Sequence, residues 1–294
     1  MDATTRKKVW RVLSFALKLL VTALILYGLF RRMDFGKVWQ NLLNQPVWLI
    51  LAILGLAALR HWWQCLAWQY SLQINPLFVL KRKEVFESYM IGQALRFAVP
   101  GSWGIMGKVA YVSNSSKAAS MISCMLERIY VTWSIFVFAS LALLYLPHGI
   151  PGWVRWLLFI GLLTLPVWLY FVTYLNRRWV RLRAGYIRYA PRLTLLMIGA
   201  TLINHFQYWL MLNLNQAVPF WDVVKRMSLS HLSYSIPVTV AGLGLKESFA
   251  ISLLSKIGLQ AESIASTTLT IFIINDVVPA LIGAGIFLRM KGIR

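Results

Sequence analysis

Two segments of the sequence interrupt apolar stretches with proline, glycine and then a lysine. Proline and glycine end helices, and the free amides at the start of the next helix favour an anion. Glycine would let a headgroup approach the backbone, and lysine would add positive charge. We therefore expect these segments, called elbows here, to bind phosphate. Their residues are Pro100, Gly104, Gly107 and Lys108 in the first elbow and Pro237, Gly242, Gly244, Lys246 and Glu247 in the second.

The apolar stretches also contain an excess of basic over acidic side chains, which favours an anionic ligand. Ionisable residues inside a membrane mark functional sites by default. The set is Arg60, Arg96, Lys108, Arg128 and Lys246 against Glu127, Glu247 and Asp276. We add Arg96, Glu127, Arg128 and Asp276 to the elbow residues as the predicted substrate-binding site. For Arg60 and His61 we favour a place near the cytoplasmic interface, and for Asn204 and His205 a contact between helices.

The adjacent residues Glu127 and Arg128 point about 100° apart on a helix. We therefore expect each of them to find its partner on another segment. Glu127 is predicted to pair with a lysine of an elbow, and Arg128 with Asp276 or with the substrate.

The composition is that of an integral membrane protein. Of the 294 residues, 59% are hydrophobic and 13% are charged, and the mean hydropathy is +0.64, whereas soluble domains are about 25% charged. The net charge of +21 is ascribed to membrane topology and anionic lipid, because no nucleic-acid motif is present. Cys65 and Cys124 have no metal or CxxC spacing. We expect no metal and no cofactor.

The pattern predicts an all-α polytopic protein with about six full transmembrane helices and two shorter broken segments. The full helices are expected at 9–30, 46–70, 118–146, 153–175, 193–214 and 264–288. The elbows break the segments 85–111 and 229–257, whose arms are too short to cross a core of about 30 Å. We expect no soluble domain and no cleaved signal peptide, so that 1–294 is a single transmembrane domain.

Loop charges predict the orientation. The loop 176–192 carries six arginines and no acid, which places it in the cytoplasm, together with both termini. The loop 147–152 has no lysine or arginine and is expected outside. Counting crossings makes 85–117 a re-entrant hairpin from the cytoplasmic side and 229–262 one from the outer side. The two halves, about 46–146 and 193–290, would then form an inverted repeat, which in transporters surrounds the substrate site.

The elbow sequences resemble those of a known family. "VPGSWGIMGKVAYV" with "SMISCMLERIYVTW", and "SIPVTVAGLGLKESFAISLLSKIGL", are similar to the motifs of the lysylphosphatidylglycerol synthase transmembrane-region family. This family includes the flippase half of the multiple peptide resistance factor and small stand-alone relatives. The resemblance implies two opposed re-entrant hairpins that move lipids between leaflets. It carries over to Pro100, Gly104, Lys108, Glu127, Arg128, Pro237, Gly242, Gly244, Lys246 and Glu247.

The first motif departs from the family pattern, which usually has Gly-Asp or Gly-Glu before an arginine. Here Gly107-Lys108 supplies no acid, which argues against a cationic headgroup. The aminoacyl-transferase domain of the full-length enzyme is also absent from the sequence, so we expect no lysylphosphatidylglycerol synthesis.

These features predict a lipid flippase-like transporter in the cytoplasmic (inner) membrane of a bacterium or archaeon. Its substrate would be an anionic phospholipid or a polyprenyl-phosphate-linked lipid. No GxSxG, HExxH or Walker A motif is present, so we do not expect an enzyme. The alternative is a membrane partner subunit or enzyme that presents a polyprenyl-phosphate sugar to a glycosyltransferase. A glycosyltransferase and a second copy of the chain stay open as partners.

Overall fold

The computed structural model describes residues 35–98, 100–146, 149–175, 179–235 and 244–290. The expected first helix at 9–30 and the elbow residues Pro237 and Gly242 lie outside these residues. The described chain is helical and contains no strand. Its elements are α2 (Phe35–Leu43), α3 (Val47–Gln73), α4 (Arg82–Ala98), η1 (Pro100–Tyr111), α5 (Lys117–Tyr145), α6 (Gly152–Leu163), α7 (Leu165–Leu175), η2 (Val180–Leu182), α8 (Arg183–Asn215), α9 (Phe220–His231), η3 (Leu232–Ser235), α10 (Leu245–Leu254), η5 (Ser255–Ile257), α11 (Ala261–Phe272), η6 (Ile273–Val277) and α12 (Val278–Arg289).

Four helical stretches within the described residues are long and apolar enough to cross a membrane. They are Val47–Gln73, Lys117–Tyr145, Val180–Leu214 and Ala261–Arg289. The pair α6 and α7 becomes a fifth if it is counted as one bent span. The chain is therefore a multi-pass membrane protein, and the expected helices at 46–70, 118–146 and 264–288 correspond to three of these stretches.

The expected straight helix at 153–175 is bent by 54° between α6 and α7. Thr164 lies at the bend, and its hydroxyl donates to the carbonyls of Ile160 (2.8 Å) and Gly161 (3.2 Å). Such back-bonding bends helices, and Pro166 two residues later has no amide hydrogen to donate. The bend therefore follows from local chemistry that the hydropathy pattern does not register.

Two predicted loops are helical. α8 begins at Arg183, ten residues before the expected start at 193, so half of the supposed cytoplasmic loop extends the helix. The guanidinium of Arg183 lies 4.6 Å from the ring of Tyr174. The loop charges also predict an outer linker near 219–227, but this segment lies mostly in α9, in which Val223, Val224 and Met227 are buried. Both segments contain charged residues, so neither forms a long apolar run in the sequence.

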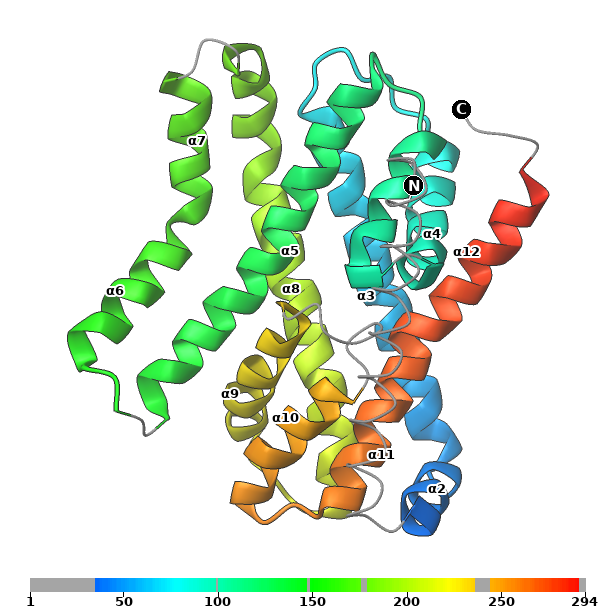
Figure 1. The fold of residues 1–294 in the computed structure, drawn as a ribbon, viewed down its shortest axis with the longest axis vertical. Helices are drawn as coiled ribbons and strands as arrows, with labels where there is room; N and C mark the ends of the chain where they lie inside the picture. The colour runs from blue at the N-terminus through cyan, green and yellow to red at the C-terminus, as the bar shows by residue number, and fades with distance from the viewer. Residues whose placement is uncertain (1–34, 99, 147–148, 176–178, 236–243, 291–294) are drawn as a thin grey trace, which may run out of the picture.

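Each half of the chain contributes an arm that packs on the last helix of the other half. The arm α4 contacts η1 and α12, whereas the arm α9 contacts α10 and α5. α3 and α8 lie against each other in the centre (Figure 1). Two of these contacts require glycine: a Cβ at Gly283 of α12 would overlap the backbone carbonyl oxygen of Met90 in α4, and one at Gly199 of α8 would overlap the side-chain ring of Trp63 in α3.

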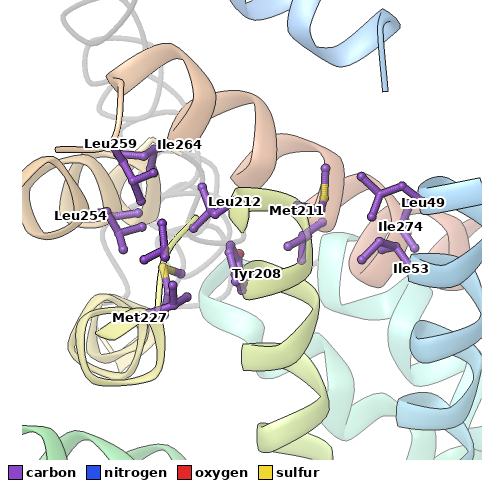
Figure 2. Close-up of a cluster of buried hydrophobic side chains, with 14 of the residues drawn as sticks. Leu49, Ile53, Tyr208, Met211, Leu212, Met227, Leu254, Leu259, Ile264 and Ile274 are labelled. Carbon is purple, nitrogen blue, oxygen red and sulfur yellow. The ribbon is translucent and has the colours of Figure 1, made fainter. Parts of the chain in front are cut away.

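The largest buried apolar cluster among the described residues joins the start of α3 and the end of α8 to α9, α10 and α11. Figure 2 shows Leu49 and Ile53 of α3 facing Met211 of α8, with Met227 and Leu254 on the other side of α8. This cluster packs α9, α10, α11 and η6 against the central pair of helices. A smaller cluster packs α4 and η1 on the other part of α3, around the fully buried Trp68.

Candidate functional site

A cavity of about 480 Å³ lies between the two halves, within the size range of small-ligand sites. Its wall comes from α3, α4, η1, α5, α8, α9 and η6. The charged residues that line it are Arg60, Arg96, Arg128 and Asp276, and the polar ones are His61, Gln64, Gln93, Thr132, Ser134, Thr201, Asn204 and His231. Three guanidinium groups and one carboxylate therefore face one space.

Asp276 pairs with Arg96 across the wall of the cavity. Arg96 Nη1 donates to Asp276 Oδ1 over 2.7 Å, and only 18% and 9% of these side chains are exposed. The expected pairing of Asp276 with Arg128 is therefore wrong. Asp276 lies in η6, a π-helical turn. Such a turn alters the direction of the side chains it carries, which a count of residues along an ideal helix cannot foresee.

Two guanidinium groups at the cavity have buried nitrogen atoms to which no described residue offers a hydrogen-bond partner, Arg60 Nη1 and Arg128 Nε. Arg128 Nη2 lies 3.8 Å from Glu127 Oε1, so these neighbours do approach each other, contrary to expectation. Glu127 offsets only part of the charge of Arg128, because the same carboxylate also binds Lys108 through Oε2. The cavity thus holds positive charge and hydrogen-bond donors that the described residues leave uncompensated.

Lys108 of the first elbow binds Glu127 in a buried ion pair, and this expected pair is confirmed. The two side chains are 0% and 1% exposed, and Lys108 Nζ also lies 3.9 Å from the centre of the Trp68 ring. Lys108 is not among the described residues that line the cavity. A lysine that is neutralised and enclosed in this way holds η1 against α3 and α5.

The first elbow uses its glycines for packing. A Cβ on Gly107 would lie 2.6 Å from Leu95 Cδ1, and one on Gly92 would lie 3.1 Å from Lys108 Cβ. These glycines let η1 lie directly on α4. At Gly107 the side chain of Leu95 occupies the space next to the backbone, and the headgroup contact expected there stays a prediction. Gly104 is buried, and the side chain of Pro100 is outside the described part.

The second elbow is described only from Gly244 onwards. Gly244 has a positive φ of 80°, which favours glycine, and its amide donates to Glu247 Oε2 over 2.7 Å. Glu247 thus caps α10. Lys246 is 3% exposed, with Nζ 5.1 Å from the ring centre of Tyr208. Like Lys108, neither Lys246 nor Glu247 belongs to the described lining of the cavity.

A chain of hydrogen bonds supports the π-helical turn behind Asp276. His61 Nε2 donates to the carbonyl of Asn275 over 2.9 Å, and His61 Nδ1 lies 2.8 Å from the hydroxyl of Tyr89. The side-chain amides of Asn275 and Gln207 also bind each other. Because the protein residues satisfy this turn so fully, it holds Asp276 in a defined position.

Of the predicted site residues, Arg96, Arg128 and Asp276 are brought together at the cavity. Arg60 and Asn204 also line it, although the sequence placed them at an interface and in a helix contact. The sequence does contain a signal that Arg60 faces a polar site, since it is a lone charge in an otherwise uncharged helix. Asn204 gave no comparable signal.

The comparisons with known proteins agree with this architecture. The family described as "Lysylphosphatidylglycerol synthase TM region" matches residues 15–283. No curated protein matches the chain. The match covers the great majority of the sequence, including every described residue of the cavity. The chain therefore belongs to the lysylphosphatidylglycerol synthase TM region family.

Proposed function

We propose that the protein moves an anionic phospholipid or a polyprenyl-phosphate-linked lipid between membrane leaflets. The observation that carries the proposal is the pair Arg60 and Arg128, whose buried nitrogens have no partner in the cavity. Buried donors without partners are rare and costly. A phosphate bound between the two guanidinium groups would satisfy both through charge-assisted hydrogen bonds. The family to which the chain belongs supports a role in membrane lipid biology.

The charge of the cavity favours this substrate over a cationic lipid. Three arginines face one aspartate, and that aspartate already binds Arg96. An ammonium group would meet only repulsion from the described charged residues that remain. The same arginines attract a phosphate, and this attraction is stronger in a buried site than in bulk water.

Alternating access would arise from two halves that rock around the cavity. The halves have matching parts: each elbow lysine lies over an aromatic ring of the central helix of its own half, Lys108 over Trp68 and Lys246 over Tyr208. The arms α4 and α9 each contact the last helix of the opposite half. This correspondence supports the inverted repeat at 46–146 and 193–290, with re-entrant hairpins at 85–117 and 229–262.

The distribution of basic residues supports an orientation with both termini in the cytoplasm. Arg181, Arg183, Arg188 and Arg192 cluster at one end of α8, and cytoplasmic segments near membrane helices collect such residues. We place the protein in the cytoplasmic membrane on this basis.

The direct test is lipid movement in proteoliposomes that contain the purified full chain and a fluorescent phosphatidylglycerol or a labelled polyprenyl phosphate. We expect movement by the wild type and a loss of at least about tenfold in Arg60→Gln and Arg128→Gln, the scale of one charge-assisted hydrogen bond. Arg82→Gln, at the exposed start of α4, is the matched control. Equal rates in all three variants would refute the site. Sugar transfer that needs an added glycosyltransferase, without lipid movement, would favour a partner subunit.

A further inference from the structure

The wall of the cavity also carries hydrogen-bonding groups without charge. Asn204 of α8 lines it and is only 9% exposed, yet its side-chain oxygen Oδ1 has no hydrogen-bond partner among the described residues. Buried polar atoms are nearly always satisfied, and an exception calls for a missing partner. Asn204 Oδ1 thus requires a donor that the described protein residues do not supply.

The polar neighbours of Asn204 already form hydrogen bonds with other groups, so we expect a ligand to supply the donor. Thr201, one turn earlier, binds the hydroxyl of Ser134 at 2.8 Å, and Ser134 donates to the carbonyl of Val131. His205 has both ring nitrogens engaged, with the carbonyl of Thr201 at 2.7 Å and the hydroxyl of Ser228 at 2.9 Å. These groups satisfy one another, whereas Asn204, which lines the cavity, keeps its side-chain oxygen without a partner among the described residues.

The charges around the cavity favour a hydroxyl over an ammonium group as the donor to Asn204. Asp276 is the one carboxylate among the described residues of the cavity wall, and Arg96 occupies it. Glu127 is 1% exposed and binds Lys108. An ammonium group would therefore meet Arg60 and Arg128 without a free carboxylate among the described residues of the wall, a repulsion that selects against it. A hydroxyl carries no charge and can both donate and accept.

We infer that Asn204 determines substrate specificity by accepting a hydrogen bond from a hydroxyl of the headgroup. The substrate class is then a lipid phosphate whose headgroup is hydroxylated and carries no ammonium group. This inference rests on the proposed function. A glycerophospholipid with a polyol headgroup and a polyprenyl-phosphate sugar share this chemistry, and the experiment below distinguishes them.

The experiment compares lipids that differ only in the headgroup, moved by the full chain in proteoliposomes. Phosphatidylglycerol carries hydroxyls, phosphatidylpropanol has nearly the same size and charge without them, and phosphatidylethanolamine carries an ammonium group. We expect phosphatidylglycerol to move about tenfold faster than phosphatidylpropanol, the factor expected for one hydrogen bond between neutral groups. A parallel arm compares a polyprenyl-phosphate sugar with the polyprenyl methyl phosphate. If the rate depends on hydroxyls in only one arm, that arm identifies whether the substrate is a glycerophospholipid or a polyprenyl-phosphate sugar.

The variant Asn204→Leu keeps the approximate shape and removes the acceptor. It should slow the hydroxylated lipid to the rate of its hydroxyl-free counterpart and leave that counterpart unchanged, which also reports correct folding. Asn44→Leu, at an exposed asparagine, should leave every rate unchanged. Asn204→Asp adds a carboxylate to the cavity and should raise the rate for phosphatidylethanolamine relative to phosphatidylglycerol, which keeps the test open if the leucine variant does not fold.

The outcomes separate the inference from the function on which it rests. Equal rates for hydroxylated and hydroxyl-free lipids, with Arg60→Gln still inactive, would overturn the role of Asn204 and leave the proposed function standing. Rapid movement of phosphatidylethanolamine by the wild type would overturn the exclusion of ammonium. Absence of movement for every lipid would overturn both.

Discussion

Arg96 and Asp276 lie 180 residues apart in the chain and meet at 2.7 Å on the wall of the cavity. Their pair connects the end of α4, in the first half, to the π-helical turn of the second half. A contact that joins the two halves at the proposed site must either persist or break when the halves move. This position makes it the first target for testing how the halves communicate.

Asp276→Asn and Arg96→Gln should each lower lipid movement by at least about tenfold, because one charge of a largely buried pair loses its partner. The exchanged variant, Arg96→Asp with Asp276→Arg, should recover part of the rate. Initial rates in proteoliposomes measure both effects. An exchanged variant as slow as the single variants would show that the residues act separately.

The pair of Lys108 and Glu127 should matter for stability more than for substrate binding. Lys108→Met or Glu127→Gln leaves a buried charge unpaired, which costs about 3–5 kcal/mol, so we expect a lower unfolding temperature in detergent. The double variant Lys108→Met with Glu127→Leu removes both charges and should recover most of that loss.

The double variant also separates packing from binding. Since neither side chain is among the described residues that line the cavity, purified double variant should move lipid within a few-fold of the wild type. A stable double variant that moves no lipid would place Lys108 or Glu127 in the binding machinery after all.

Two glycines of α12 give a matched test of helix packing. A Cβ at Gly283 would overlap the carbonyl oxygen of Met90, whereas one at Gly285 meets open space. Gly283→Ala should push α12 away from α4 and destabilise the protein by about 1–3 kcal/mol. Gly285→Ala should be neutral or stabilise by up to about 1 kcal/mol. Thermal unfolding of both variants in one detergent measures the difference, and equal effects would contradict the close approach of α12 to α4.

Glu84 should make stability depend on acid pH. Burial alone would raise the pKa of Glu84, but hydrogen bonds from Ser113 and the charge of Lys81 outweigh it, so the pKa lies below its usual value. A lowered pKa in the folded state adds stability above the usual glutamate pKa of about 4.3. That stability is lost as the pH falls through the folded pKa.

Unfolding temperatures between pH 6 and pH 3 test this expectation. Glu84→Gln should be less stable than the wild type at pH 6 and should approach it at pH 3. The contact joins the start of α4 to the residues just after η1, so it reports on the packing of these two elements. A constant difference across this range would assign the contribution of Glu84 to something other than its ionisation.

The sequence was sufficient for features that depend on short-range chemistry. Hydropathy located α3, α5 and the stretch from α11 to α12, and the need to neutralise a charge in an apolar environment predicted the partner of Glu127. The family motifs indicated the match to residues 15–283. These conclusions hold because they depend on composition, on length and on the cost of burying a charge.

The cavity could not be predicted because its residues come from seven elements whose orientation depends on tertiary packing. Arg60 was predicted to lie near the membrane interface, because its position at the cavity depends on how α3 packs on α8. Asp276 was given the wrong partner because η6 is a π-helical turn. The bend at Thr164 and the polar helix α9 do not follow from hydropathy, because hydropathy registers only long apolar runs.

The π-helical turn at Ile273–Val277 also acts as a spacer in the chain. Such a turn corresponds to one residue more than a regular α-helix needs, and each residue turns a helix by about 100°. Everything after Val277 is thus rotated relative to α11, which lets Asp276 face the cavity while Gly283 faces α4. Deleting one residue here would restore a regular helix but turn Gly283 away from Met90. A single inserted residue therefore sets the orientation of the last helix, and the site and the packing of α12 depend on it together.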